Sequence, residues 1–416
     1  MKRRLRFLAL YVLPLFMPAC TDSRGGGTWA GTTETLPNGA VRVRNPAAAL
    51  WGPQNAWQLE AELVLGQVEG DGADVFASIS GLQADAAGRI YVLDRQTNEL
   101  RIFDAAGRHV RSVGRAGEGP GEYSAANGLL WMSEDTLLVV DQRGGRYTIL
   151  SSEGDYVRSV RRRLGFYAWA FDGGMDGDRV YEVSTVGQSE TPQLALLGTR
   201  VRGAEVEGGI AMTEQEVETG PRFIADTIML PSPDGPLYEA FSVRTPRQGM
   251  VISVPFSGAP VHYLDGKSGV WYGHGRNPAV YHATVRGDTL AEILLGTEPV
   301  PVSPDEVTEW LAQPSIEQFR TLGGKLDADR IPRTKPYFDR ITSDAEGNLW
   351  LTVPAGPQQV LFAILDPEGR YLGQLKVDGV RRDAYLSPLV RNDRLYFVGR
   401  DELDVQRVYV YRVNKS

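Results

Sequence analysis

The chain has 416 residues, of which 42% are hydrophobic and 23% are charged, and its formal net charge is −8 at pH 7. This composition is typical of a globular protein, and the acidic balance excludes the basic surface that nucleic-acid-binding proteins use. With a single cysteine the chain cannot form an internal disulfide bond. Its 47 glycines and 25 prolines favour many turns between short strands.

The first twenty residues, MKRRLRFLALYVLPLFMPAC, have the pattern of a secretory signal. Basic residues precede an apolar run from Phe7 to Met17, which is shorter than the roughly 20 residues needed to cross a bilayer. Ala19 and then Cys20 follow, and this end of the segment resembles the lipobox of bacterial lipoproteins. We therefore predict a lipoprotein signal peptide over residues 1–19 and lipidation of Cys20. The alternative is a soluble secreted protein in which Cys20 is incidental.

Lipidation would decide where the protein is located. Two or more acyl chains hold a protein firmly on a membrane. Thr21, and not Asp, follows Cys20, which is similar to the outer-membrane sorting signal of Gram-negative lipoproteins. We expect a protein of the bacterial cell envelope, lipid-anchored, in the outer membrane and facing the periplasm or the exterior. Residues 20–56 are predicted to be a tether and leading segment, and the mature chain carries a net charge of −12.

An internal repeat dominates the rest of the chain. Residues 89–113, RIYVLDRQTNELRIFDAAGRHVRSV, return 47 residues later as TLLVVDQRGGRYTILSSEGDYVRSV. Each copy alternates β-branched and aromatic residues with Gly, Asp and Asn clusters, which predicts strands joined by tight turns. Two further clear copies, GNLWLTVPAGPQQVLFAILDPEGRYLGQL and NDRLYFVGRDELDVQRVYVYRV, and two weaker ones bring the number of units to six. A period of about 40–50 residues with four strands is typical of a β-propeller.

We therefore predict an all-β fold, a six-bladed β-propeller of four-stranded antiparallel blades over residues 57–416. The last copy ends after three strands, and an open ring would leave unpaired strand edges. Residues 57–66, WQLEAELVLG, alternate as a strand does and are expected to complete the last blade. Independent sandwich sheets, the alternative, explain the period poorly.

Two segments interrupt the predicted ring. Residues 303–323 begin with Ser303, Pro304 and Glu306, an N-cap, a first-turn proline and a capping-box partner. Pro314 divides this segment, so we predict a short helical insertion of two helices packed on one rim, in preference to a partner-binding helix. Residues 203–220, rich in Glu, are predicted to be a polar loop within blade three.

The repeat carries a family resemblance. GRIYVLDRQTNELRIFDAAGRHVRSVGRAGEGPGEY, TLPNGAVRVRNP and DAEGNLWLTV resemble segments of six-bladed, NHL-like propellers from bacterial envelope lipoproteins. The resemblance covers most of the mature chain and implies the propeller fold. It implies no single function, because propellers include lyases, lactonases, receptors and scaffolds.

Motifs for catalysis are weak in this sequence. There are four histidines, at positions 109, 262, 274 and 282, and no G-x-S-x-G motif, so we predict no hydrolase triad. The acidic turns at residues 69–74 and 172–178 lack the spacing of an EF-hand calcium loop, so we predict turns, with no metal and no cofactor; calcium binding without a motif is the alternative. Residues 117–122, GEGPGE, lack the Lys-Ser/Thr of a phosphate-binding loop and are predicted to be an inter-blade turn.

The candidate binding residues come from propeller geometry. Loops that join second to third strands, and loops between blades, gather on one face around the channel mouth. The candidate residues on these loops are Arg95, Arg115, Arg143, Arg146, Arg161, His274 and Arg276. Basic groups gathered on an acidic molecule favour an anionic ligand, for which Arg offers bidentate hydrogen bonds. The alternative is an ordinary solvated surface.

We expect a membrane-anchored, non-catalytic propeller that binds an anionic small ligand or a protein, and no nucleic acid. One alternative is a metal-dependent enzyme of the lactonase or lyase type, which requires three or more acidic or Asn side chains converging in the channel. Another alternative is an assembly scaffold, which would show a broad apolar patch near Trp310 and Phe319.

Overall fold

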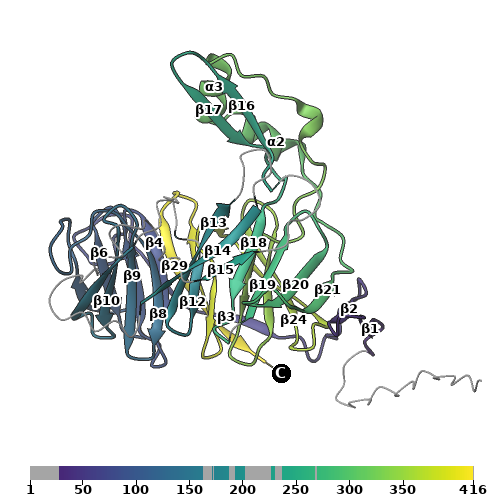
Figure 1. Cartoon of the computed structure of the whole chain (residues 1–416), viewed down its shortest axis with the longest axis horizontal. Coiled ribbons are helices and arrows are strands. Elements are labelled where there is room, and N and C mark those ends of the chain that lie inside the picture. Colours follow the sequence, from purple (N-terminus) through teal and green to yellow (C-terminus); the bar gives the residue numbers. More distant parts are fainter. Residues whose placement is uncertain are drawn as a thin grey trace, which may run out of the picture.

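The protein is a six-bladed β-propeller (Figure 1), as the sequence predicts. The computed structural model describes residues 28–162, 171, 173–186, 193–201, 226–229, 237–267 and 269–415. Strands predominate among these residues, which also form two short helices that stand apart from the ring. The predicted polar loop at residues 203–220 and the predicted acidic turn at residues 172–178 lie wholly or partly outside the described residues.

The first three blades follow one another along the chain, each an antiparallel four-stranded sheet. Blade 1 consists of β4 (Ile79–Ala84), β5 (Ile90–Asp94), β6 (Glu99–Phe103) and β7 (His109–Val113). Blade 2 consists of β8 (Ala126–Ser133), β9 (Thr136–Asp141), β10 (Arg146–Ser151) and β11 (Tyr156–Arg161). Blade 3 consists of β12 (Gly173–Asp176), β13 (Arg179–Val186), β14 (Gln193–Arg200) and β15 (Asp226–Met229).

The last three blades carry additional strands. Blade 4 consists of β18 (Pro260–Leu264), β19 (Gly269–His274), β20 (Ala279–Thr284) and β21 (Thr289–Leu294), extended by β2 (Val41–Arg44) and β1 (Thr32–Thr35). Blade 5 consists of β22 (Arg340–Ser343), β23 (Leu349–Pro354), β24 (Gln359–Leu365) and β25 (Tyr371–Asp378). Blade 6 consists of β27 (Leu389–Arg391), β28 (Arg394–Arg400), β29 (Gln406–Asn414) and β3 (Gln58–Leu65), with β26 (Arg381–Arg382) beside β28.

A repeated aspartate turn explains the recurring Asp-x-x-Gly sequence. In blade 1 the Asp85 carboxylate accepts hydrogen bonds from the backbone amides of Ala87 and Arg89, at 2.9 and 2.8 Å. Its second oxygen pairs with the Arg89 guanidinium at 2.6 Å. Gly88 lies between them at φ 82°, in the left-handed region that glycine adopts without strain. Asp104 and Asp366 make the same contacts with Arg108 and Arg370.

The ring closes through pairing of the two ends of the propeller domain. Strand β3 runs antiparallel to β29, with Leu63 opposite Val410 and Leu65 opposite Val408. Residues 57–66 therefore supply the outer strand of the last blade, which confirms the predicted closure. The Leu65 side chain is 4% exposed and lies in a cluster that joins blades 6 and 1.

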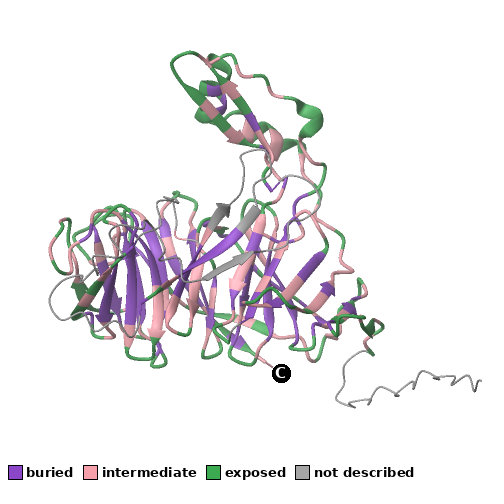
Figure 2. Cartoon of the chain, in the orientation of Figure 1, coloured by how far each residue is buried: buried purple, intermediate pink, exposed green. Residues whose placement is uncertain are grey.

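The hydrophobic core lies between the blades. Six clusters of buried side chains among the described residues each join two neighbouring blades. Figure 2 shows the buried residues following the strands of the ring, while exposed residues occupy the turns. Each blade buries its two apolar faces only against its neighbours, so stability depends on an unbroken ring.

A small projecting unit, which we call the insertion, stands above one face of the ring (Figure 1). It contains the hairpin β16 (Ala240–Arg244) and β17 (Gly249–Ser253), the helices α2 (Pro304–Leu311) and α3 (Pro314–Thr321), and the 3-10 turn η1 (Ala328–Arg330). The capping box of Ser303 and Glu306 is present, as predicted. The helices pack on the hairpin, which the sequence analysis did not predict. Because Phe319 is fully buried in this unit, it contributes to no surface patch.

A buried lysine attaches the insertion to the propeller. The Lys335 side chain is 4% exposed, and its Nζ lies 2.6 Å from Glu306 of helix α2. The same ammonium donates a hydrogen bond to the backbone carbonyl of Ala355 in blade 5. A buried charge needs such partners, so this contact fixes helix α2 against blade 5.

No helix in the described ranges is long and apolar enough to span a membrane.

The closing strand allows a direct stability test. We expect Leu65→Ala to lower the free energy of unfolding by about 2–5 kcal/mol, because it leaves a cavity between blades 6 and 1. The matched control is Val64→Ala on the same strand, where the side chain is 49% exposed, with an expected change within about 0.5 kcal/mol. Urea unfolding followed by tryptophan fluorescence measures both. Equal losses of unfolding free energy in the two variants would contradict the role given to the contact between blades 6 and 1.

Candidate ligand-binding face

Two kinds of loop emerge on one face of the ring, which we call the loop face. They are the loops between the second and third strands of each blade and the loops between consecutive blades, because alternating antiparallel strands return to the same side. The insertion leaves from the inter-blade loops that precede and follow blade 4, so it also belongs to this face (Figure 1). The remaining turns, between first and second and between third and fourth strands, form the opposite side, which we call the turn face.

Two neighbouring hollows lie on the loop face around blade 1. One, of about 860 Å³, lies between blades 1 and 2 and is lined by Arg95, Gln96, Ser124, Gln142 and Arg143, among others. The other, of about 190 Å³, lies between blades 1 and 6 and includes Arg95, Tyr385 and Arg400. Both hollows share Ser78 and Arg95. The structure therefore brings together two of the seven predicted residues, Arg95 and Arg143.

The sequence analysis missed Arg400, although the repeat contained the signal. GRIYVLDR in blade 1 aligns with DRLYFVGR in blade 6, which places Arg400 at the position of Arg95. Both arginines stand where the second strand of a blade ends, and both line the smaller hollow. The same alignment places Gln142 of blade 2 at this position, next to Arg143.

Buried carboxylates hold these loops in place. Asp94 is fully buried, and its carboxylate accepts hydrogen bonds from three backbone amides, those of Ala77, Ser78 and Gln96. Asp141 of blade 2 is equally buried and accepts from the amides of Ser124, Ala125 and Gly144. Each carboxylate joins an inter-blade loop to a second-to-third-strand loop, so its role is to position the hollow that contains Arg95 and Arg143.

The arginines of the two hollows differ in their surroundings. Arg143 is exposed and makes no hydrogen bond or ion pair with any residue that the structure describes, while Arg95 is half-buried and has a partner. Arg400 lies 3.9 Å from Asp383 and 3.6 Å from Asp404. The uncompensated positive charge of this part of the loop face is therefore centred on the larger hollow.

Two other predicted arginines hold the GEGPGE turn. Arg115 pairs with Glu122 at 2.6 Å. Arg146 donates to backbone carbonyls of the turn, at 2.6 Å from both Glu118 and Glu122. These contacts account for the inter-blade turn at residues 117–122. Arg161 ends β11 on the exposed rim and does not line either hollow.

The last two predicted residues lie at the base of the insertion. His274 is 2% exposed, and its Nε2 lies 3.1 Å from the backbone carbonyl of Leu237. The guanidinium of Arg276 lies against the imidazole ring, with Nε 3.2 Å from Nδ1, and also pairs with Glu239 at 3.4 Å. Burial, and then the neighbouring Arg276, lower the pKa of His274. The side chains of His274 and Arg276 are therefore engaged in contacts that support the insertion.

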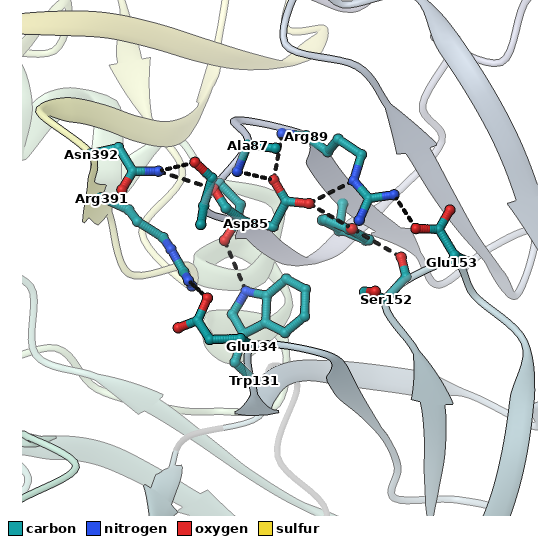
Figure 3. A network of polar contacts seen from close by, with 12 residues as sticks. Asp85, Ala87, Arg89, Trp131, Glu134, Ser152, Glu153, Arg391 and Asn392 are labelled. Carbon is teal, nitrogen blue, oxygen red and sulfur yellow. Dashed lines mark hydrogen bonds and ion pairs between the residues drawn. The ribbon is translucent and has the colours of Figure 1, made fainter.

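On the turn face around blade 1, polar contacts connect neighbouring blades (Figure 3). Asn392 of blade 6 donates to the backbone carbonyls of Asp85 and Ala86 in blade 1, at 3.2 and 3.0 Å. Arg391 reaches across to Glu134 of blade 2 at 2.7 Å and lies over the Trp131 ring. These contacts connect blades 6, 1 and 2 at the seam where the ring closes.

The chemistry of the larger hollow is that of hydrogen-bond donors. Guanidinium, amide and hydroxyl groups line it, and its nearest carboxylates, Asp94 and Asp141, are already bonded to backbone amides. Such donors suit carboxylate or phosphate oxygens. Among the residues that the structure describes, no group of three or more His, Cys, Asp or Glu side chains is placed to hold a metal ion.

Comparison with known proteins agrees with the architecture. Residues 75–162, which contain blades 1 and 2, match the family DUF5128, described as a 6-bladed beta-propeller. No curated protein sequence matches the chain.

Solved structures with similar folds share little sequence with the chain. A member of the DUF4221 family from Bacteroides vulgatus is 12% identical, with coverage of 87% of this chain and 100% of its own, and a TM-score of 0.44. A protein from Bacteroides fragilis, named as exported, is 10% identical, with coverages of 90% and 99% and a TM-score of 0.40. A catalytically inactive virginiamycin B lyase from Staphylococcus aureus, solved with quinupristin, is 10% identical, with coverages of 86% and 99% and a TM-score of 0.37.

His274 should make stability depend on pH. Its pKa is lowered from the ordinary value of 6.5, so the unfolded chain binds the proton more readily than the folded one. We expect the contribution of His274 to be complete above about pH 7 and to be lost as the pH falls below 6.5. His274→Gln should reduce this loss between pH 7.5 and 5.5 in urea unfolding, whereas His109→Gln, at an exposed position, should not. An unchanged pH profile in His274→Gln would contradict this assignment.

Proposed function

We propose that this protein is a lipid-anchored, non-catalytic propeller of the bacterial cell envelope that binds an anionic ligand on its loop face. The ligand is an anionic small molecule or an acidic group on a partner protein. The observation that carries the proposal is the larger hollow, about 860 Å³ in volume, which contains Arg95 and the exposed Arg143.

Electrostatics supports an anion at this position. The mature chain carries a net charge of −12, so a local positive site stands out against the rest of the surface. The side chains of Gln96, Ser124 and Gln142 add neutral polar groups beside the two guanidinium groups. Arginine presents paired N–H donors that match a carboxylate or a phosphate. Because Arg400 has carboxylate neighbours, the larger hollow suits an anion better than the smaller one.

The anchor is supported by the N-terminal sequence. Cys20 follows a basic and apolar leader, and Thr28 is the first described residue. Eight residues span at most about 28 Å when extended, so a lipidated Cys20 would hold the β1–β2 edge of blade 4 near the membrane. The insertion stands above the ring, away from that edge (Figure 1). The loop face would then remain accessible to a ligand.

Charge reversal in the larger hollow tests the binding role. We expect Arg143→Glu to weaken binding of an anionic probe at least tenfold, about 1.4 kcal/mol. The probes are inorganic phosphate, citrate and a hexaglutamate peptide, titrated by isothermal calorimetry. Arg108→Glu makes the same change of charge on the turn face, where the Arg108 side chain is 82% exposed, and should leave binding unchanged. Arg276→Glu is a poor choice because it would also break the contact with Glu239.

Two results would contradict the proposed binding role. Absence of binding by all three probes would do so. Equal weakening by Arg143→Glu and Arg108→Glu would show that only overall charge matters, and it would remove the larger hollow as the site.

The lipid anchor has its own test. In cells of a Gram-negative host that express the full chain, we expect labelled palmitate to be incorporated and the protein to sediment with the outer membrane. Cys20→Ala should abolish the label and move the protein out of the membrane fraction, because the acyl chains supply the anchoring free energy. A membrane-bound Cys20→Ala protein without label would contradict lipidation as the anchor.

A further inference from the structure

A cavity larger than either loop-face hollow lies on the turn face, away from the proposed anion site. Its volume is about 1460 Å³, and it is open to solvent. It extends from the turns of blades 1, 2 and 6, at the channel mouth, across blade 5 to strand β2 at the outer edge of blade 4. We call it the turn-face groove. A groove of this length suits a chain-like ligand better than a single small molecule.

A row of aromatic side chains forms one wall of the groove. Tyr263 on β18, Trp271 on β19 and His282 on β20 are direct cross-strand neighbours, and all three are half-buried in the groove. The Trp271 and His282 rings are stacked, with centroids 4.1 Å apart and an interplanar angle of 5°. Ala291 and Val41 continue the row on the next two strands, and their small side chains leave space beside the rings.

The aromatic rings are held in fixed orientations. His282 Nε2 lies 3.1 Å from the Asp265 carboxylate, and the Tyr263 hydroxyl accepts a hydrogen bond from Ser343 at 3.2 Å. Asp265 is itself held by the backbone amides of the turn that it begins, and these contacts lower its pKa against the effect of burial. A pre-formed aromatic surface loses little entropy when a ligand binds.

The carboxylates that line the groove are compensated in place, and one exposed ammonium, that of Lys267, lines it without an ion pair to any described residue. Every carboxylate that lines it has a cationic or imidazole partner within 3.4 Å. The pairs are Glu134 with Arg391, Asp265 with His282, Asp344 and Glu346 with Lys415, and Glu368 with Arg370. Figure 3 shows the first of these pairs at the channel-mouth end. A cationic ligand would therefore find no unmatched carboxylate here, and among the described lining residues the unmatched charge is the ammonium of Lys267.

Paired charges still have hydrogen-bonding capacity. A carboxylate has about four lone-pair directions and a guanidinium five N–H groups, so each pair can still bind hydroxyl groups. Aromatic rings provide apolar area together with polar edges. These two properties match a sugar ring, which carries apolar C–H faces and hydroxyl groups. We propose that the turn-face groove binds a neutral oligosaccharide.

The test is a calorimetric titration of the full protein with neutral hexasaccharides. The probes are maltohexaose, cellohexaose, laminarihexaose and chitohexaose, with hexagalacturonate as the charged comparison. We expect at least one neutral probe to bind and to bind more tightly than hexagalacturonate. Trp271→Ala should weaken that binding at least tenfold, and Arg143→Glu on the loop face should leave it unchanged.

A second variant protects the test against misfolding of Trp271→Ala. Ala291→Leu fills the space beside His282 at a half-buried strand position and should also weaken binding, with unfolding curves confirming that the variant is folded. The proposal is overturned if none of the four neutral probes binds, if hexagalacturonate binds more tightly, or if folded variants at both positions bind normally. Anion binding at Arg143 is measured separately, so failure of one site does not imply failure of the other.

Discussion

The architecture depends on one constraint, which is that no blade can bury its own apolar faces. A four-stranded sheet with large side chains on both faces needs a neighbour on each side, and only a closed ring gives every blade two neighbours. The cluster around Leu65 shows the result, because strands from near both ends of the chain, β3 and β29, complete blade 6 against blade 1. The polar contacts of Arg391 and Asn392 reinforce the same seam from the turn face.

The same constraint makes rigid binding loops available. Since the strands end at fixed heights around the ring, a loop is placed by the blade that carries it and needs only local contacts to hold its shape. The buried carboxylates of Asp94 and Asp141 provide these contacts by binding amides from two different loops. An acidic residue at the end of a strand therefore serves to position the arginine that follows it. Arg400 occupies the position of Arg95 in blade 6, where Gly399 replaces the acid, and it lines the same hollow.

The fold could be predicted from the sequence because the strands and turns of each repeat are determined by residues close together in the chain. Turn residues such as Gly88 and cap residues such as Ser303 determine the backbone conformation only a few positions away along the chain. Their pattern can therefore be recognised in the sequence alone. The binding surface is harder to predict because it depends on partners far apart in the chain. Arg276 stands in a loop of suitable sequence, yet Glu239 already occupies it. The aromatic row requires the register of three strands, so Trp271 and His282 could not be recognised as neighbours from spacing alone.

The two faces of the ring differ in how their charges are used, and this difference follows from the turns. On the turn face the Asp-x-x-Gly-Arg sequence places a carboxylate and a guanidinium four residues apart, so a turn of that sequence neutralises itself, as Asp366 and Arg370 do. On the loop face, the acid at the end of a second strand, such as Asp141, is buried and accepts hydrogen bonds from backbone amides. The arginine that follows it in the loop, Arg143, therefore has no carboxylate partner among the described residues. One repeat unit thus produces a face whose turn carboxylates are paired with cations and a face on which Arg143 has no carboxylate partner among the described residues. The two proposed sites lie on opposite faces with the packed core of the blades between them, so under these proposals the two ligands would bind at the same time.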